Sequence, residues 1–450
     1  MNNASAKIIA SSTAGDTVVA SAARISTTQG TALEIYAKSC EKENNETLIE
    51  KVCASGHTST LEHQFFTVAF DNVSVCTEEF VIEFRLGSYT VKSRRYVDFE
   101  NAGFYIPPMP DALLPDYKAH MQSLFDAYGK LTALGIPKED ARYLLPYCFR
   151  SNFYCTMNAR ELLYMVTVMC TGRGSAYPEL KMLGESLKSQ LRNCFPNLPD
   201  QFAQRFISDK NAAQYAPHDI AAAIPAPEIR TAKTALRSLS ADCARQMLSP
   251  DAAAVWSAAP AAPDWDDILH GERPRWLELI HAQFEIRDLS LAAITHLVRH
   301  RIQTVLVPQV TQAALRQHYV LPETIAANDE ARKIYENAFS ENAAALRRML
   351  DTGLPAEAVQ YFALAGSQLN VICDMNGREL LHFMKLRTCN RAQWEIRACA
   401  IDLLKALRAE APEVFSKFGP SCFVAGKCPE GRLTCGQFAE VTDRFASAAL

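Results

Sequence analysis

Two short arginine-rich segments hold the side chains of this chain that are best suited to bind an anion. The first reads Ser93-Arg94-Arg95-Tyr96. Because guanidinium groups donate paired hydrogen bonds to phosphate oxygens, adjacent arginines beside a hydroxyl group predict a phosphate-binding loop. Taken alone, a solvent-exposed basic turn explains these four residues better.

The second segment reads Arg299-His300-Arg301 and follows a helical pattern. Arginine is rarely buried without a partner, so an anion such as a cofactor pyrophosphate would satisfy this triplet. An exposed helix end, where cations complement the helix dipole, explains it equally well. Further on, Arg378 and His382 share one face of an expected helix, which an ordinary amphipathic helix would also produce.

These segments belong to a register that occurs twice. Glu62 and Arg85 each have a counterpart of the same residue type 216 positions later. The run Met-Asn-Ala-Arg-Glu-Leu-Leu at 157–163 returns as Met-Asn-Gly-Arg-Glu-Leu-Leu at 375–381, an offset of 218 positions. Three matches at nearly constant spacing indicate a tandem duplication. Function is therefore to be sought in the two copies together.

Strand and helix patterns occur in both copies, so the expected fold is mixed α/β, with two similar domains in tandem. In the first copy, the run 65–70 predicts a strand, Asp71 and Asn72 a turn or helix cap, and 76–85 a helix. In the second copy the pattern predicts a strand at 277–288, a helix that begins at a cap on Asp288 and reaches Arg301, and long helices at 328–350 and 376–408.

The expected domains are residues 1–215 and 269–450, joined by a linker at 216–268. The linker is rich in alanine and proline, and we expect a helix around 229–247 within it. A chain of 450 residues suits two or three domains, each able to bury a full core.

Composition excludes several classes of protein. A net charge of −4 gives no electrostatic case for binding bulk nucleic acid or a membrane surface. No apolar run reaches the roughly 18 residues needed to span a bilayer, and the first residues lack the pattern of a secretory signal. Fourteen cysteines in such a chain predict free thiols in a cytoplasmic protein.

Taken together, the motifs resemble those of the flavin-dependent thymidylate synthases. The resemblance rests on His57 and Glu62 before a strand, Arg-His-Arg after a helix, Ser-x-Arg-Tyr, Asn-x-Arg, and the most specific block, Ala-Gln-Trp-Glu-Ile-Arg at 392–397. It covers most of both halves. It implies a homotetrameric enzyme that binds FAD at sites between subunits. It further implies conversion of dUMP to dTMP, with methylenetetrahydrofolate as carbon donor and NADPH as reductant.

The resemblance assigns only part of a site to the first half. It implies contacts with the flavin for His57, Ser59 and Glu62. It implies contacts with the nucleotide for Ser93, Arg94, Arg95 and Arg142. His57 and Tyr96 are also catalytic candidates, although His57 also suits a structural role at the entry to a strand and Tyr96 is equally compatible with plain packing. The second half has Arg273 in place of the histidine and has lost the serine–arginine loop.

The second half retains the complementary part. The resemblance implies flavin contacts for Arg299, His300, Arg301, Asn376, Arg378 and His382. Arg387 would hold the nucleotide and stabilise charge on the pyrimidine, and His296 would lie near the base. The first half has Tyr164 in place of His382 and Met169 in place of Arg387. This pattern predicts division of labour, in which two chains form a homodimer that acts as a pseudo-tetramer with two complete sites.

One departure from the family pattern leaves the substrate open. Thr90 and Val91 stand where the family has an asparagine and a glutamate, so a hydrogen-bond acceptor of the nucleotide site is lost. An unpaired buried polar group costs about 1–3 kcal/mol, which is enough to change nucleotide preference. Two alternatives therefore remain, a flavoenzyme of the same fold with another substrate and a non-catalytic nucleotide-binding relic.

The C-terminal region is rich in thiols, with Cys422, Cys428 and Cys435 around a Lys-Cys-Pro-Glu-Gly run. Their spacing does not match common zinc motifs, which begin with a gap of two to four residues, and no fourth ligand is evident. We therefore predict a structured thiol-rich tail without a metal, and a metal site is the less favoured alternative.

Overall fold

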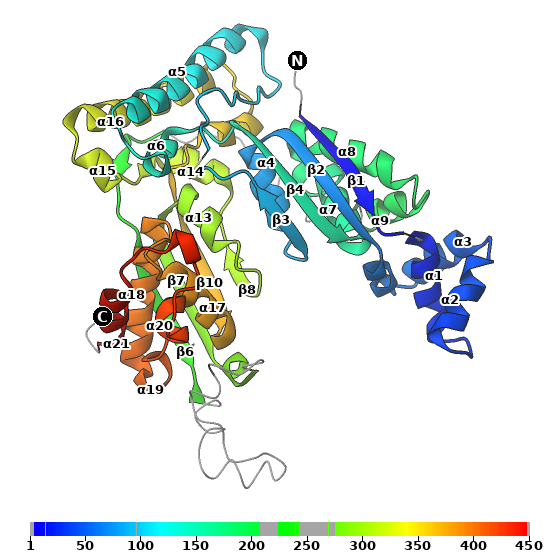
Figure 1. Ribbon diagram of the computed structural model, residues 1–450. Coiled ribbons are helices and arrows are strands. Elements are labelled where there is room, and N and C mark those ends of the chain that lie inside the picture. Colours follow the sequence, from blue (N-terminus) through cyan, green and yellow to red (C-terminus); the bar gives the residue numbers. More distant parts are fainter. Residues whose placement is uncertain are drawn as a thin grey trace. The chain divides into compact units, whose positions relative to one another are not determined.

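The computed structural model describes residues 4–13, 15–95, 97–207, 224–242, 269 and 275–447 (Figure 1). The chain forms two compact units, each made of two stretches of sequence. Unit 1 comprises Met1–Pro225 and Ala327–Leu364, and unit 2 comprises Ala226–Ala326 and Ala365–Leu450. None of the described helices is both long enough and apolar enough to cross a bilayer.

Unit 1 is built on a four-stranded antiparallel sheet in the order β1-β2-β4-β3. Its strands are β1 (Ser5–Ser11), β2 (Phe65–Ser74), β3 (Gly87–Val91) and β4 (Arg150–Asn158). Alternate residues of a strand point to the same face, and Phe66, Val68 and Phe70 of β2 are buried in this way. The ring of Phe70 stacks on that of Phe153 in β4, with centroids 4.6 Å apart.

Helices cover the buried face of this sheet. Helix α7 contacts β2 and β4, and α8 contacts both α7 and β1 (Figure 1). Elsewhere in the unit, α5 packs against α16, and His120 of α5 is hydrogen-bonded to Asn342 of α16 at 2.9 Å. The helices are α1 (Gly15–Ile25), α2 (Ala32–Cys40), α3 (Asn45–Ala54), α4 (Val75–Ile82), α5 (Leu114–Ala133), α6 (Lys138–Ala141), α7 (Ala159–Cys170), α8 (Pro178–Leu191), α9 (Leu198–Ile207) and α16 (Asp329–Asp351).

Unit 2 repeats the sheet with the corresponding order β6-β7-β10-β8, again antiparallel. Its strands are β6 (Lys233–Ser240), β7 (His281–Ser290), β8 (Gln303–Leu306) and β10 (Gln368–Asn376), and a short parallel pair joins β5 (Glu228–Ile229) to β9 (His318–Tyr319). The helices are α13 (Leu291–Leu297), α14 (Val310–Arg316), α15 (Glu323–Ala326), α17 (Gly377–Arg387), α18 (Trp394–Glu410), α19 (Pro412–Phe415), α20 (Ser421–Ala425) and α21 (Phe438–Ala446).

A buried serine–glutamate pair recurs in the two units. Ser74 caps α4, and its backbone nitrogen donates to Glu179 at 2.8 Å. In unit 2, Ser290 caps α13 and donates in the same way to Glu395 at 2.9 Å. In both units the serine hydroxyl also donates to the same carboxylate. The two units therefore share side-chain networks as well as strand order, which agrees with a duplicated chain.

The same serines correct the expected helix caps. Asn72 and Asp288, taken as possible caps, lie two residues earlier and adopt left-handed backbone angles, with φ of 53° and 52°. Asparagine and aspartate tolerate this conformation better than other side chains. Each of them lies within an irregularity in strand pairing, two residues before the capping serine.

The other predicted helices, strands and domain boundaries agree with the structure only in part. The strand at 65–70 and the helix at 328–350 are confirmed as β2 and α16, whereas the helix expected at 376–408 is two helices, α17 and α18. The helix around 229–247 is wrong, because Lys233–Ser240 pairs with β7 as an edge strand. The described part of the expected linker is therefore partly sheet. The expected boundary at 269–450 also needs correction, since Ala327–Leu364 groups with unit 1.

Candidate active site

The loop that follows β3 in unit 1 holds the first arginine cluster. Arg95 forms a two-pronged ion pair with Glu139, with Nε–Oε1 at 2.9 Å and Nη2–Oε2 at 3.1 Å. The Arg95 backbone nitrogen donates to the Ser93 hydroxyl at 3.3 Å, which folds the loop back on itself. Ser93 is exposed and Arg95 is half-buried, so the loop presents both at the surface of unit 1.

Arg94 points inward instead. Its Nη2 atom lies 2.5 Å from Oε2 of Glu78, and its side chain is only 10% exposed. Ser151 donates a hydrogen bond to the same carboxylate, and the guanidinium lies 5.2 Å from the centre of the Phe149 ring. Burial alone would lower the pKa of Arg94, but Glu78 and Glu79 raise it above its ordinary value. This environment indicates that Arg94 anchors the loop, whereas the sequence suggested substrate contact.

Arg142 lies close to both of these arginines. It belongs to the short 3-10 helix Arg142–Leu144, is 3% exposed, and donates from Nε to the Glu139 carbonyl at 3.0 Å. Its Nη2 atom is buried and lacks a hydrogen-bond partner among the described residues. Burial, together with the charges of Arg94 and Arg95, lowers the pKa of Arg142. An anion bound here would supply the missing acceptor and offset the repulsion between the cations.

The other residues assigned to unit 1 lie at the start of β2. His57 and Ser59 are exposed at the 3-10 helix Thr58–His63. In the same helix, Glu62 accepts a hydrogen bond from Arg160 at 2.6 Å. Tyr96 lies outside the described residues, as does Arg273, so the structure gives no account of their expected roles.

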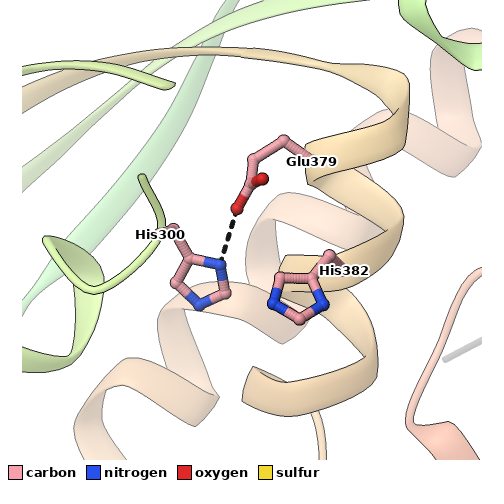
Figure 2. A group of neighbouring side chains, drawn as sticks. All are labelled: His300, Glu379 and His382. Atoms are coloured by element: carbon pink, nitrogen blue, oxygen red, sulfur yellow. Dashed lines mark hydrogen bonds and ion pairs between the residues drawn. The ribbon is translucent and has the colours of Figure 1, made fainter. Parts of the chain in front are cut away.

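In unit 2, His300 is the centre of a buried hydrogen-bond network (Figure 2). Its Nδ1 atom lies 2.9 Å from Oε1 of Glu379, and Nε of Arg387 donates to its Nε2 atom at 3.0 Å. An imidazole that accepts at Nε2 and is hydrogen-bonded to a carboxylate at Nδ1 is the neutral tautomer with its proton on Nδ1. Burial lowers the pKa of His300, and the Arg387 charge adds to that effect. The network therefore orients Arg387 through a neutral histidine.

The other predicted residues of unit 2 surround this network. Asn376 caps α17 by accepting from the Glu379 backbone nitrogen at 2.9 Å. The ring of His382 meets that of His300 edge-on, with centroids 5.3 Å apart. Arg378 pairs with Glu278 at 2.7 Å, the counterpart of the Arg160–Glu62 pair in unit 1. Four other side chains that the family resemblance assigned to the site are not part of the buried network. Arg299, Arg301 and His382 are exposed, and His296 is half-buried on α13.

Ligand atoms of His300, Glu379 and His382 lie within 4.8 Å of one another, which is close enough for a metal ion (Figure 2). Both ring nitrogens of His300 are already engaged, one of them by the positively charged Arg387. A cation would have to displace that contact and tolerate the arginine beside it. The triad is therefore better described as a hydrogen-bond network.

Among the residues that the structure describes, each network is absent from the other unit. In unit 1 the positions of His300, His382 and Arg387 hold Phe84, Tyr164 and Met169. The rings of Phe84 and Tyr164 meet edge-on at 5.7 Å, and Met169 is fully buried. In unit 2 the positions of Glu78, Arg94 and Ser151 hold Ile294, Val310 and Leu369. Apolar packing has thus replaced a polar network once in each unit.

The sequence did not identify the acidic partners of these arginines. Glu78 and Glu139 hold the first cluster, and Glu379 holds the second. One signal was present: a glutamate follows the arginine of Asn-x-Arg in both copies, as Glu161 and Glu379. Its pairing depends on the residue that folding brings opposite, which is a histidine in one unit only.

Fold and site together define a class, a duplicated α+β protein with a separate arginine cluster in each half. The family model described as thymidylate synthase complementing protein matches residues 7–197 and 265–413. The chain belongs to this family. The family model matches the chain in two segments, which agrees with the tandem arrangement. The curated relatives of the chain are named as enzymes.

Individual relatives match less than half of the chain. The flavin-dependent thymidylate synthase of Geobacter sulfurreducens is 36% identical over 197 residues, which cover 43% of this chain and 84% of the relative. That of Clostridium tetani is 30% identical, covering 37% and 73% respectively. Among solved structures, the UMP/dUMP methylase PolB from Streptomyces cacaoi matches with a TM-score of 0.38 and 22% identity, covering 45% of this chain and 96% of PolB.

Proposed function

We propose that the protein is an FAD-dependent methyltransferase that acts on the ring carbon of a uracil nucleotide, in a reaction of the dUMP-to-dTMP type. Methylenetetrahydrofolate would be the carbon donor and NADPH the reductant. One observation carries the proposal: each unit keeps the polar network that the other has replaced by apolar packing. Random mutation of two non-functional copies would not leave each unit with the one polar network that the other unit has lost.

The first cluster would bind the nucleotide phosphate. Arg142 offers a buried donor without a partner, and Arg95 carries a second cation at the same loop. Charge-assisted hydrogen bonds from two guanidinium groups are strong and directional, so they suit a phosphate group. Ser93 would add a neutral donor, and His57 with Tyr96 would complete the catalytic groups of unit 1.

The second cluster has the features that FAD requires. Arg299, Arg301 and His382 are exposed cations or donors that a pyrophosphate would accept from. Ile302 and Leu386 are 68% and 40% exposed beside them, which suits a flat ring system. Asn376 and Arg378 would complete the contacts. Bound FAD would supply the redox chemistry, while Arg387, held by His300, would stabilise negative charge on the pyrimidine.

Two copies of the chain would complete each site, with unit 1 of one copy beside unit 2 of the other. The sheets leave apolar side chains uncovered, including Tyr154 at 55% exposure in unit 1. In unit 2, Leu306 and Ile372 are cross-strand neighbours and are 61% and 51% exposed. Exposed apolar faces of this kind are typical of surfaces that a partner covers. Free thiols at every described cysteine suit the reducing cytoplasm that we infer for the protein.

The absorbance spectrum of the purified protein tests the proposal first. We expect flavin bands in the visible range, or their appearance when the protein is mixed with FAD. Production of dTMP should then require dUMP, methylenetetrahydrofolate and NADPH together. A protein that stays colourless with added FAD would overturn the proposal, since every later step depends on the flavin.

A second candidate is a flavoenzyme of the same fold that acts on another nucleotide. Thr90 and Val91 favour it, because they form the end of β3 where the family has a carboxylate. A ribonucleotide or a modified uracil would meet a different set of acceptors there. Shifts of the flavin bands with a panel of uracil nucleotides separate the two candidates, and turnover of dUMP dismisses the second.

A further inference from the structure

The carboxylate of Glu379 lies in the interior of unit 2, although the residue belongs to the first turn of α17. Its backbone nitrogen donates to the cap residue Asn376, and its side chain extends to the ring of His300 (Figure 2). Oε1 lies 2.9 Å from Nδ1 of that ring, and the side chains of Glu379 and His300 are only 9% and 2% exposed. A charged group with so little access to water needs a partner that stabilises it. Glu379 therefore has a role beyond the start of its own helix.

Unit 1 has the same glutamate without the histidine. Glu161 occupies the position in α7 that Glu379 occupies in α17, three residues after the asparagine cap. Phe84 stands in place of His300, and its ring meets that of Tyr164 edge-on at 5.7 Å. Glu161 is half-buried, whereas Glu379 is buried. The fold therefore accepts the glutamate in both units, and its contact with a histidine belongs to unit 2.

The imidazole of His300 connects two side chains that belong to different turns of one helix. Glu379 and Arg387 are eight positions apart on α17, a separation of about 12 Å along the helix axis. Nε of Arg387 lies 3.0 Å from Nε2 of the ring, and Glu379 faces the other ring nitrogen. The rings of Phe383 and His382 meet the imidazole edge-on at 5.0 and 5.3 Å, which fixes its plane. His300 is thus held so that a change at Glu379 reaches Arg387.

The proton on the ring decides whether Arg387 keeps this contact. A guanidinium group can only donate, so Nε2 of His300 must present a lone pair and the ring proton must lie on Nδ1. An ionised carboxylate can only accept, so Glu379 favours the same tautomer. Without the carboxylate, a buried Nδ1–H group would lack an acceptor, and the proton would be free to move to Nε2. An N–H group at Nε2 would then face the N–H group of Arg387, and the hydrogen bond would be lost.

We propose that Glu379 is a positioning residue for the nucleotide, because it keeps His300 in the tautomer that holds Arg387 in place. This inference rests on the proposed function, in which Arg387 contacts the pyrimidine. Glu379 acts through His300 and touches neither substrate nor flavin. The network also releases Arg387 when His300 takes up a second proton, since two cationic donors would then lie 3.0 Å apart.

The release of Arg387 has a defined dependence on pH. Burial lowers the pKa of His300, the hydrogen bond to Glu379 raises it, and the charges of Arg387 and His382 lower it. Among the described residues, the titratable groups that act on the ring in this way all belong to α17. The pKa lies below its ordinary value, so the ring is neutral and holds Arg387 at neutral pH, and the contact is lost as the pH falls through that pKa. Removing the charge of Glu379 takes away a contribution that raises the pKa, so the loss should move to lower pH.

Two substitutions separate positioning from structural support. Glu379→Leu removes the acceptor, so it should raise the KM for the nucleotide about tenfold or more in mildly alkaline buffer. Glu379→Gln keeps an acceptor oxygen, so its KM should stay within about threefold of wild type while the acidic limb of its pH profile moves to lower pH. Glu161→Leu and Glu161→Gln are matched controls and should change neither quantity. An unchanged KM in Glu379→Leu would overturn the proposal, as would an acidic limb that stays in place in Glu379→Gln.

The tautomer of His300 can be measured without enzyme activity. In the full-length protein labelled with nitrogen-15 at its histidines, solid-state NMR distinguishes a ring protonated at Nδ1 from one protonated at Nε2. The variant His300→Phe introduces the residue that unit 1 has at this position, and it identifies the His300 signals by their loss. We expect the proton on Nδ1 in the wild type and in Glu379→Gln, and on Nε2 or shared between the two nitrogens in Glu379→Leu.

These spectra also separate the inference from the proposed function. A wild-type ring protonated at Nε2, or the same His300 signals in Glu379→Leu as in wild type, would overturn the role of Glu379 even in an active enzyme. If the wild type turned over no uracil nucleotide, the proposed function would fail, and the spectra would still decide whether Glu379 sets the tautomer of His300.

Discussion

At the scale of single residues, the role of Arg142 becomes clear when it is compared with the equivalent position of the other repeat. The second repeat of the sequence carries Gln360 at the equivalent position, so the fold accepts a shorter neutral side chain there. In unit 1 the arginine is buried beside two other arginines, an arrangement that costs stability unless it serves a ligand. This cost supports the proposal that Arg142 binds the nucleotide.

Replacing Arg142 by glutamine should therefore weaken nucleotide binding without unfolding unit 1. Loss of a charge-assisted hydrogen bond of about 1.5–3 kcal/mol corresponds to a rise in the KM for the nucleotide of about 10- to 140-fold. The kcat should change much less. Steady-state kinetics measure both, and Arg192→Gln, which removes an exposed pair with Asp200, is the control. An unchanged KM would remove Arg142 from the site.

The arginines of the candidate site could be found from the sequence, but their partners could not. Arginine, serine and histidine in short motifs signal anion binding by residue type alone. Glu139 lies 44 positions from Arg95, and nothing local in the sequence joins them. Arg94 was misread for the same reason, because its burial depends on Glu78 and Ser151, which only the fold brings to it.

At the scale of elements, the buried serine–glutamate pairs fix the helices that precede the site loops. Ser290 caps α13, whose end leads directly to Arg299 and His300. Its hydroxyl serves the helix end and Glu395 at once, so its loss would leave a buried carboxylate short of a donor. We expect Ser290→Ala to lower the free energy of unfolding of unit 2 by about 1–3 kcal/mol.

Tryptophan fluorescence during urea unfolding measures this change selectively. All four tryptophans lie at positions 256–394, within the two stretches of unit 2. The Ser290→Ala variant should shift the fluorescence midpoint to lower urea. Ser74→Ala removes the equivalent contact from unit 1, so it should shift circular dichroism more than fluorescence. Equal fluorescence midpoints for Ser290→Ala and wild type would contradict the prediction.

The sequence predicted elements best where they are long or centrally placed. Helix α16 and strand β2 have strong periodicity and keep it in the fold. The helix expected around 229–247 failed because Lys233–Ser240 is an edge strand, half-exposed along most of its length and without clean alternation. Its conformation comes from pairing with β7, a contact that distant residues supply.

At the scale of the whole molecule, division of labour can be tested by mixing two defective chains. Arg142→Gln damages unit 1, and Arg387→Met damages unit 2 by introducing the residue that unit 1 holds at the equivalent position. If each site combines units from two copies, a mixed dimer has one site that carries both changes and one that is intact. It should show about half the wild-type activity per dimer.

Co-expression of the two variants with different affinity tags allows the mixed dimer to be purified. The assay should use nucleotide below the wild-type KM, where each variant alone is nearly inactive. Mixed dimers of two Arg387→Met chains with different tags control for the purification. A mixed dimer no more active than either parent would mean that sites do not combine units from two copies.

The placement of residues 327–364 limits how far the duplicated chain can be taken apart. Although they lie in the second repeat by sequence, α16 and the residues after it belong with unit 1, where Phe362 meets the ring of Tyr117 edge-on at 5.8 Å. If the chain were cut between the two repeats, the first fragment would therefore lack α16, which belongs to the interior of unit 1. The second fragment would carry α16 without the unit against which this helix packs. The halves remain free to diverge in sequence, yet gene fission can no longer return them to independent proteins.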